Sequence, residues 1–197
     1  MTKIEGIKLE TQFENPIDLV LNRVAVKMNK ILYVFHFTPN IITLISLIFS
    51  LLGVYYIHFK YYKLGALLFF VGYFFDCADG IFARKYNMMT KFGDYFDHIS
   101  DIVKMILLYS VIQLSDLQYI NKIVFYVITA IFIVLLNLHL GCQETYYNKK
   151  SSLDITKKLC WNKEHIKYTK YVGCGTFFVV LCIYLFFMKE INRLFNL

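Results

Sequence analysis

Apolar and polar positions alternate along this chain in long blocks, not at the short period of an exposed strand. From residue 41 onward, apolar segments of about the length that a bilayer requires follow one another between short polar stretches. The segments that we expect to form spanning helices are 41–59, one from about residue 61 to beyond residue 75, one that continues over residues 102–114, and then 120–140 and 171–188. The pattern predicts an all-α integral membrane protein with five or six transmembrane helices, forming a single domain over residues 1–197.

The N-terminal part of the chain has a different pattern. Residues 1–14 are polar and are expected to be flexible, whereas Asn15 can cap a helix and Pro16 suits its first position. Apolar residues then recur at helical spacing over residues 15–36: Ile17, Val20, Leu21, Val24, Met28, Ile31, Leu32 and Phe35. Basic residues (Arg23, Lys27 and Lys30) fall on other sides of the same helix. This arrangement predicts an amphipathic helix in the membrane interface, the alternative being a helix packed on a soluble partner.

Composition agrees with a membrane protein, because 58% of the residues are hydrophobic and 18% are aromatic. The net charge of +7 comes from basic residues spread between apolar segments without a nucleic-acid motif, so we expect the lipid bilayer as partner and no nucleic acid. The lysine-rich segment 143–170 and the N-terminal arm are predicted to lie in the cytosol by the positive-inside rule. Five cysteines form no CxxC pair, and we expect neither a disulfide nor a zinc site.

The acidic residues gather in one stretch. Five of the 14 acidic residues fall between Asp76 and Asp101. Asp76 and Asp79 stand one helical turn apart, as do Asp97 and Asp101, so each pair shares a helix face. Two such faces opposite each other would form a cage of four carboxylates, which repel one another unless a cation such as Mg²⁺ or Mn²⁺ lies between them. A solvated acidic face is the alternative, and the apolar flanks argue against it.

The position of the two aspartate pairs within the apolar segments predicts how deep they lie in the bilayer. Residues 64–75 precede the first pair and extend only about 18 Å as a helix, against about 30 Å for a hydrocarbon core. Residues 102–114 give about 20 Å beyond the second pair. Both pairs are therefore expected at a similar depth within one leaflet, where a lipid phosphate would be held with its polar group facing water.

The spacing of the acidic stretch resembles the signature of the CDP-alcohol phosphatidyltransferases. The signature reads D-x2-D-G-x2-A-R-x8-G-x3-D-x3-D, and all its fixed positions match: Asp76, Asp79, Gly80, Ala83, Arg84, Gly93, Asp97 and Asp101. The likeness in architecture covers roughly residues 15 to 142. The resemblance implies a transferase of phospholipid biosynthesis that uses two ions of Mg²⁺ or Mn²⁺. The positive-inside rule places the signature, and with it the active site, on the cytosolic side.

The resemblance also implies a role for each residue. Asp76 and Asp97 would contact both ions, Asp79 would complete one, and Asp101 would complete the other while accepting a proton from the alcohol. The CDP moiety would be bound by Thr38, Asn40, Gly80, Ala83, Arg84 and Thr90. From chemistry alone, plain helix capping explains Thr38 and Asn40 equally well, and Thr90 can also cap a helix.

Three further polar residues keep alternatives open. Asp94 is either a first-turn acid favoured by the helix dipole or an additional carboxylate of the site. Local hydrogen bonding is the preferred interpretation of His98. For His139 the sequence does not separate a satisfied polar group within the membrane from a substrate contact.

The substrates are the most open question. The short chain favours transfer of a phosphatidyl group from CDP-diacylglycerol to a small hydroxyl acceptor of the inositol, glycerol 3-phosphate or serine type, with release of CMP. Residues 168–170 resemble eukaryotic phosphatidylinositol synthases, whereas residues 96–98 are similar to choline and ethanolamine phosphotransferases. The latter suggest the alternative, transfer of a phospho-headgroup from CDP-choline or CDP-ethanolamine to diacylglycerol. A divalent-cation transporter is a remote alternative, since residues 64–75 and 102–114 offer almost no polar path. Whether the chain forms a homodimer is left open.

Overall fold

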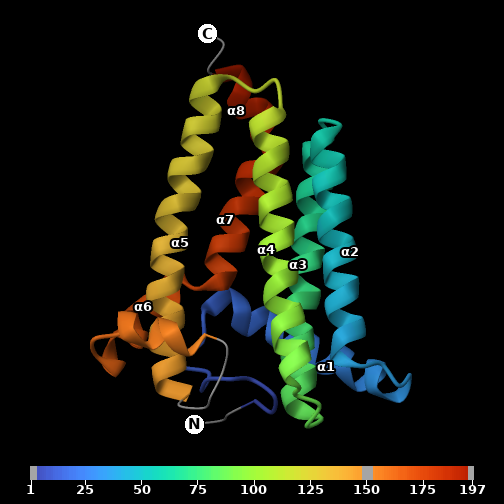
Figure 1. The fold of residues 1–197 in the computed structure, drawn as a ribbon, viewed down its shortest axis with the longest axis vertical. Coiled ribbons are helices and arrows are strands. Elements are labelled where there is room, and N and C mark those ends of the chain that lie inside the picture. Colours follow the sequence, from blue (N-terminus) through green and yellow to red (C-terminus); the bar gives the residue numbers. More distant parts are fainter. Residues whose placement is uncertain (1–3, 148–152, 195–197) are drawn as a thin grey trace.

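The computed structural model describes residues 4–147 and 153–194, and every regular element among them is helical (Figure 1). The expected all-α fold is therefore confirmed. The main helices are α1 (Pro16–Val34), α2 (Pro39–His58), α3 (Tyr62–Lys85), α4 (Lys91–Leu114), α5 (Tyr119–Tyr147), α6 (Ile166–Thr169), α7 (Cys174–Phe186) and α8 (Met188–Leu194). Short 3₁₀ turns lie between α5 and α7: η1 (Asp154–Leu159), η2 (Lys163–His165) and η3 (Lys170–Val172).

The long helices run side by side, and α1 crosses one end of the bundle (Figure 1). Four stretches among the described residues are long and apolar enough to span a membrane: Pro39–His58, Tyr62–Lys85, Tyr119–Tyr147 and Lys163–Phe186. Helix α4 has 24 residues and lies along the same bundle, but its charged residues make it less apolar. The count of five or six transmembrane helices therefore stays a prediction. Two boundaries differ from expectation, since α5 continues to Tyr147 and α7 covers only Cys174–Phe186.

The buried side of α1 is polar, although an ordinary amphipathic helix would bury its apolar stripe. Asp18, Asn22 and Asn29 face the protein together with Ala25. The Asn29 amide donates a hydrogen bond of 2.8 Å to the carbonyl oxygen of Ala78 in α3. Much of the predicted apolar stripe is exposed instead: Val20, Val24, Ile31 and Phe35. A helix exists where it was expected, and its location in the membrane interface remains a prediction.

Helices α2 and α3 approach each other closely through small residues. A Cβ atom on Gly53 would lie 2.8 Å from the carbonyl oxygen of Gly65, and one on Gly65 would lie 2.7 Å from that of Gly53. No ordinary side chain fits at these distances without displacing the backbone of the partner helix. Small residues at helix interfaces allow this close packing within membranes. The pair forms a rigid frame for the polar end of α3.

One sequence-based expectation was wrong, because Cys142 and Cys160 form a disulfide with their Cα atoms 4.8 Å apart. The chain turns back after α5, and η1 packs against the end of that helix. This reversal brings together two cysteines that are 18 positions apart. The absence of a CxxC pair gave no information about such a contact. Cys77, Cys174 and Cys182 are free.

Candidate active site

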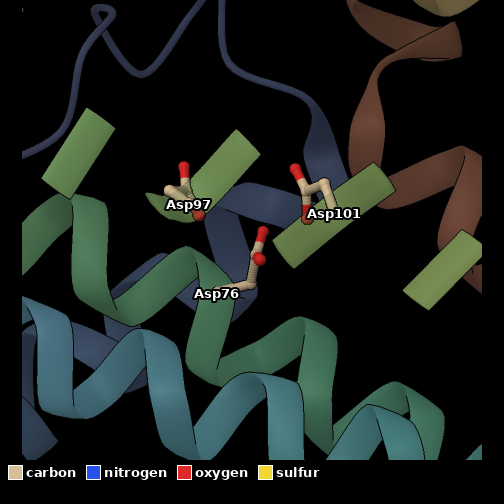
Figure 2. Close-up of side chains that lie close together, drawn as sticks. All are labelled: Asp76, Asp97 and Asp101. Carbon is tan, nitrogen blue, oxygen red and sulfur yellow. The ribbon is translucent and has the colours of Figure 1, made fainter. Parts of the chain in front are cut away.

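Three carboxylates converge at the polar end of α3 and α4 (Figure 2). Asp76 belongs to α3, and Asp97 and Asp101 belong to α4. One oxygen of each residue lies within 4.8 Å of the others. Asp97 and Asp101 are four positions apart and so project from one face of α4 toward the neighbouring helix. The structure thus brings together three of the four aspartates that the sequence singled out.

Asp79 lies beside this group and points toward α2. Its side chain is buried, and one oxygen accepts a hydrogen bond from the hydroxyl of Thr43. The same hydroxyl oxygen lies 3.1 Å from the carbonyl oxygen of Pro39 in its own helix, so its position is defined by the first turns of α2. The expected cage therefore consists of three close carboxylates and a fourth that is held by a hydroxyl. Thr43 is not among the site residues expected from the sequence.

The arrangement suits a divalent cation. Among the described residues, the Oδ1 atom of Asp97 is buried without a hydrogen-bond partner. Neighbouring carboxylates in such a place repel each other, and a cation between them removes that cost. The donor atoms are oxygens only, which suits hard ions such as Mg²⁺ and Mn²⁺. Asp76, Asp97 and Asp101 would hold such an ion, with Asp79 beside them. Their role as ligands remains a prediction that the geometry fits.

A cavity with a volume of about 320 Å³ opens next to Asp79 and Asp97. Its lining includes these two residues, Thr43 and five of the residues expected to bind CDP: Asn40, Gly80, Ala83, Arg84 and Thr90. Thr38 does not line the cavity; its hydroxyl accepts a hydrogen bond of 3.4 Å from the Ile41 amide and caps α2. Thr90 also caps its helix, accepting a bond of 2.9 Å from the Gly93 amide. Thr90 can therefore position α4 and line the cavity at once.

Arg84 forms one side of this cavity. A Cβ atom on Gly80 would lie 3.2 Å from the Nη1 atom of Arg84, so the guanidinium lies over the glycine. Its Nε atom donates a hydrogen bond of 2.7 Å to the carbonyl oxygen of Gly6. Gly6 has a φ of 87°, a left-handed conformation that glycine adopts without strain. The N-terminal arm therefore fixes the orientation of the arginine.

The arm also adds a residue to the cavity that the sequence analysis missed. Lys8 lines the cavity and forms an ion pair with Glu144 near the end of α5. The neighbouring residues Ile7 and Leu9 are buried, so this part of the arm packs against the protein, although a flexible arm was expected. Tyr147 from the same end of α5 completes the lining. The polar composition of the arm concealed these contacts.

Lys104 is a further residue that was missed. Its Nζ atom lies 2.9 Å from Oδ1 of Asp76 and 2.6 Å from Oδ1 of Asp101. The signal was present in the sequence, because Lys104 interrupts the apolar stretch 102–114 and follows Asp101 by three positions on the same helix face.

The remaining polar candidates divide between the cavity and the interior. Asp94 lines the cavity, and its Oδ1 atom lies 3.7 Å from Nε2 of His98, a contact that fits the local role preferred for the histidine. His139 is buried away from the cavity lining, with its Nδ1 atom 3.3 Å from the hydroxyl of Thr169.

Comparison with known proteins agrees with this geometry. A sequence model of the family described as CDP-alcohol phosphatidyltransferase matches residues 36–196. The chain belongs to this family. Similar proteins include the CDP-diacylglycerol–glycerol-3-phosphate 3-phosphatidyltransferases of Rickettsia typhi and Rickettsia felis, each 56% identical over 39 residues, or 20% of this chain and 22% of the relative. An uncharacterised protein of Aquifex aeolicus is 34% identical over 67 residues, or 34% of each chain. The matched stretch thus spans about a fifth of the length of the Rickettsia proteins.

Proposed function

We propose that this CDP-alcohol phosphatidyltransferase transfers a phosphatidyl group from CDP-diacylglycerol to a small hydroxyl acceptor and releases CMP. The observation that carries the proposal is the cavity of about 320 Å³ beside three convergent carboxylates at the end of a helical membrane bundle. Its volume lies at the lower end of the range typical for small-molecule sites. Two ions of Mg²⁺ or Mn²⁺ would be held by Asp76, Asp79, Asp97 and Asp101, and would supply charge stabilisation for the reaction.

The residues around the cavity have complementary roles toward the nucleotide. Gly80 and Ala83 leave the surface of α3 free of bulky side chains, so cytidine and ribose can approach the helix. Arg84 supplies a planar cation that matches phosphate oxygens. Asn40 and Thr90 provide polar groups from α2 and from the start of α4. The donor then lies with its pyrophosphate near the carboxylates and its acyl chains in the bilayer.

The chemistry is an in-line displacement at phosphorus. Bound divalent ions would stabilise the charge of the pyrophosphate and of the departing CMP. Asp101 accepts the proton of the attacking hydroxyl, a contribution that typically amounts to about 10² to 10⁴ in rate for a general base. Arg84 holds the phosphate during the transfer.

The acceptor class follows from weaker observations. The names of the Rickettsia proteins point to CDP-diacylglycerol as donor and make glycerol 3-phosphate the first acceptor to test. Inositol and serine are the other acceptors in our proposal. Water-soluble acceptors would reach the site from the cytosol, because two basic segments, α1 and the stretch from η1 to η3, lie at the same end of the bundle (Figure 1). Their basic residues are Arg23, Lys27, Lys30, Lys157, Lys158, Lys163, Lys167 and Lys170.

The test is CMP release by the purified full chain in detergent micelles. CDP-diacylglycerol is supplied with glycerol 3-phosphate, inositol or serine, first with EDTA and then with Mg²⁺ or Mn²⁺. We expect metal-dependent CMP release with one acceptor and its loss in Asp97→Asn. The matched control is Asp116→Asn, because Asp116 is exposed and pairs with Lys60 away from the cavity.

Two outcomes would contradict the proposal. CMP release from CDP-choline with diacylglycerol, but not from CDP-diacylglycerol, would establish the reverse choice of donor and acceptor. Metal-dependent uptake of a divalent ion into vesicles, without any CMP release, would indicate a transporter.

A further inference from the structure

A buried lysine faces the carboxylates from the helix that carries two of them. Lys104 is 1% exposed, and among the described residues no other lysine or arginine is buried to this degree. Its ammonium group contacts Oδ1 of Asp76 at 2.9 Å and Oδ1 of Asp101 at 2.6 Å. The ring of Phe178 in α7 covers it, with the Nζ atom 5.5 Å from the ring centroid. The lysine is thus enclosed by two proposed metal ligands and an aromatic ring.

This contact changes the charge of the site. The four aspartates carry four negative charges when ionised, and Lys104 offsets one of them. Uncompensated carboxylates in an apolar bundle would destabilise the folded protein before any ion arrives. The lysine bridges α3 and α4 through one oxygen of each carboxylate. Its positive charge therefore reduces the repulsion between Asp76 and Asp101, as a bound cation would otherwise do.

We propose that Lys104 is the resident counter-cation of the metal site. It holds Asp76 and Asp101 in place in the metal-free protein, and it competes with a divalent ion for their oxygens. Lys104 is a positioning residue, since it acts on the carboxylates and not on the substrate. The inference rests on the proposed function, because it takes these aspartates to be metal ligands.

The competition predicts both the direction and the size of the change in divalent-ion affinity when the charge of Lys104 is removed. A monovalent and a divalent cation about 5 Å apart repel each other enough to weaken binding roughly tenfold, even at the dielectric constant of water. Removing the ammonium should therefore tighten binding of the divalent ion by about tenfold or more. A lysine that only braced the site would behave in the opposite way. Its loss would disorder the carboxylates and weaken ion binding.

The test compares Mn²⁺ binding by the full chain in detergent, measured from the electron paramagnetic resonance signal of the free ion. Lys104→Met removes the charge and keeps a long apolar side chain, whereas Lys104→Arg keeps a cation. Lys122→Met is the matched control, because Lys122 is also a lysine of a long helix and donates to the carbonyl oxygen of Gln113 away from the site. We expect Lys104→Met to bind Mn²⁺ at least about tenfold more tightly than wild type. Lys104→Arg and the control should bind like wild type.

Thermal unfolding supplies a second measurement. Without metal, Lys104→Met should melt at a lower temperature than wild type, and Mn²⁺ should raise its melting temperature by more than it raises that of wild type. If Lys104→Met can be purified only in the presence of Mn²⁺, the rate at which EDTA removes the ion is compared instead. Slower removal than from wild type supports the competition.

The outcomes separate this inference from the proposed function. Suppose that wild type binds Mn²⁺ at a site that Asp97→Asn removes. If Lys104→Met then binds Mn²⁺ equally or more weakly than wild type, only the proposed role of Lys104 is overturned. If neither wild type nor Lys104→Met binds Mn²⁺, the metal site and the role of Lys104 both fail.

Discussion

Glu14 offers a quantitative test of how the N-terminal arm packs on the site. This residue precedes α1 and is 8% exposed. Burial, with a smaller contribution from the charge of Asp18, raises its pKa from 4.5 to about 7, although Arg84, Lys8 and the backbone of Leu9 act in the opposite direction. Glu14 is therefore held in a place that favours the protonated form. The substitution Glu14→Gln keeps the shape of this form and removes the charge.

The direction in which the stability of the protein changes with pH follows from the raised pKa of Glu14. An acid whose pKa is higher in the folded than in the unfolded protein binds its proton more tightly when folded, so the free energy of unfolding falls as the pH rises. The fall begins near the unfolded pKa of 4.5 and is complete above the folded pKa of about 7. The difference of about 2.5 pKa units corresponds to roughly 3 kcal/mol. Glu14→Gln should therefore stabilise the protein by about 2 to 3 kcal/mol more at pH 8 than at pH 5.

The measurement is urea-induced unfolding in detergent, followed by circular dichroism at pH 5 and pH 8. Glu5→Gln is the matched control, because Glu5 is an exposed residue of the same arm that lies 3.5 Å from the Lys85 ammonium. The control should show a much smaller difference between the two pH values. Equal effects of Glu14→Gln at both pH values, or a loss of stability at pH 8, would refute the argument that burial governs this carboxyl group.

Three further predictions concern the cavity, the proton acceptor and the disulfide. Gly80→Leu and Ala83→Leu should raise the KM for CDP-diacylglycerol or abolish activity while the protein still inserts and folds, and unchanged donor kinetics would show that cytidine binds elsewhere. Asp101→Asn should lower turnover by about 10² or more at saturating substrates; recovery at high Mg²⁺ would leave Asp101 as a ligand only. After denaturation without reductant, a maleimide should label three of the five cysteines, sparing Cys142 and Cys160, and labelling of all five would contradict the pair.

The core of the candidate site could be predicted because its information is local. Asp97 and Asp101 are four positions apart, and any α-helix places such residues on one face. The small residues Gly80 and Ala83 are three positions apart, so they likewise share one face of α3, and this face lines the cavity. The disulfide could not be predicted in this way. It depends on the reversal of the chain after α5, which no spacing between Cys142 and Cys160 encodes.

Lys104 was missed for a different reason. Counting apolar residues over 102–114 treats one lysine as a tolerable interruption, whereas a buried charge in such a segment requires a partner. The partner was within reach of the same helix, since Asp101 lies one turn earlier. The spacing of charges within apolar segments is therefore more informative than their number.

The polar contacts of the bundle explain which face of α1 turns toward the protein. Lipid is as apolar as a leucine side chain, so helices in a membrane gain little from burying apolar residues against one another, and polar contacts can decide which face turns inward. Two residues of α1 follow this rule: Asn29 donates to the Ala78 carbonyl, and Asp18 accepts bonds from the Tyr73 hydroxyl and the Gly175 amide. Both contacts on α3 flank Asp76. The inward polar face of α1 therefore orients the helix segment that carries the first carboxylate of the site.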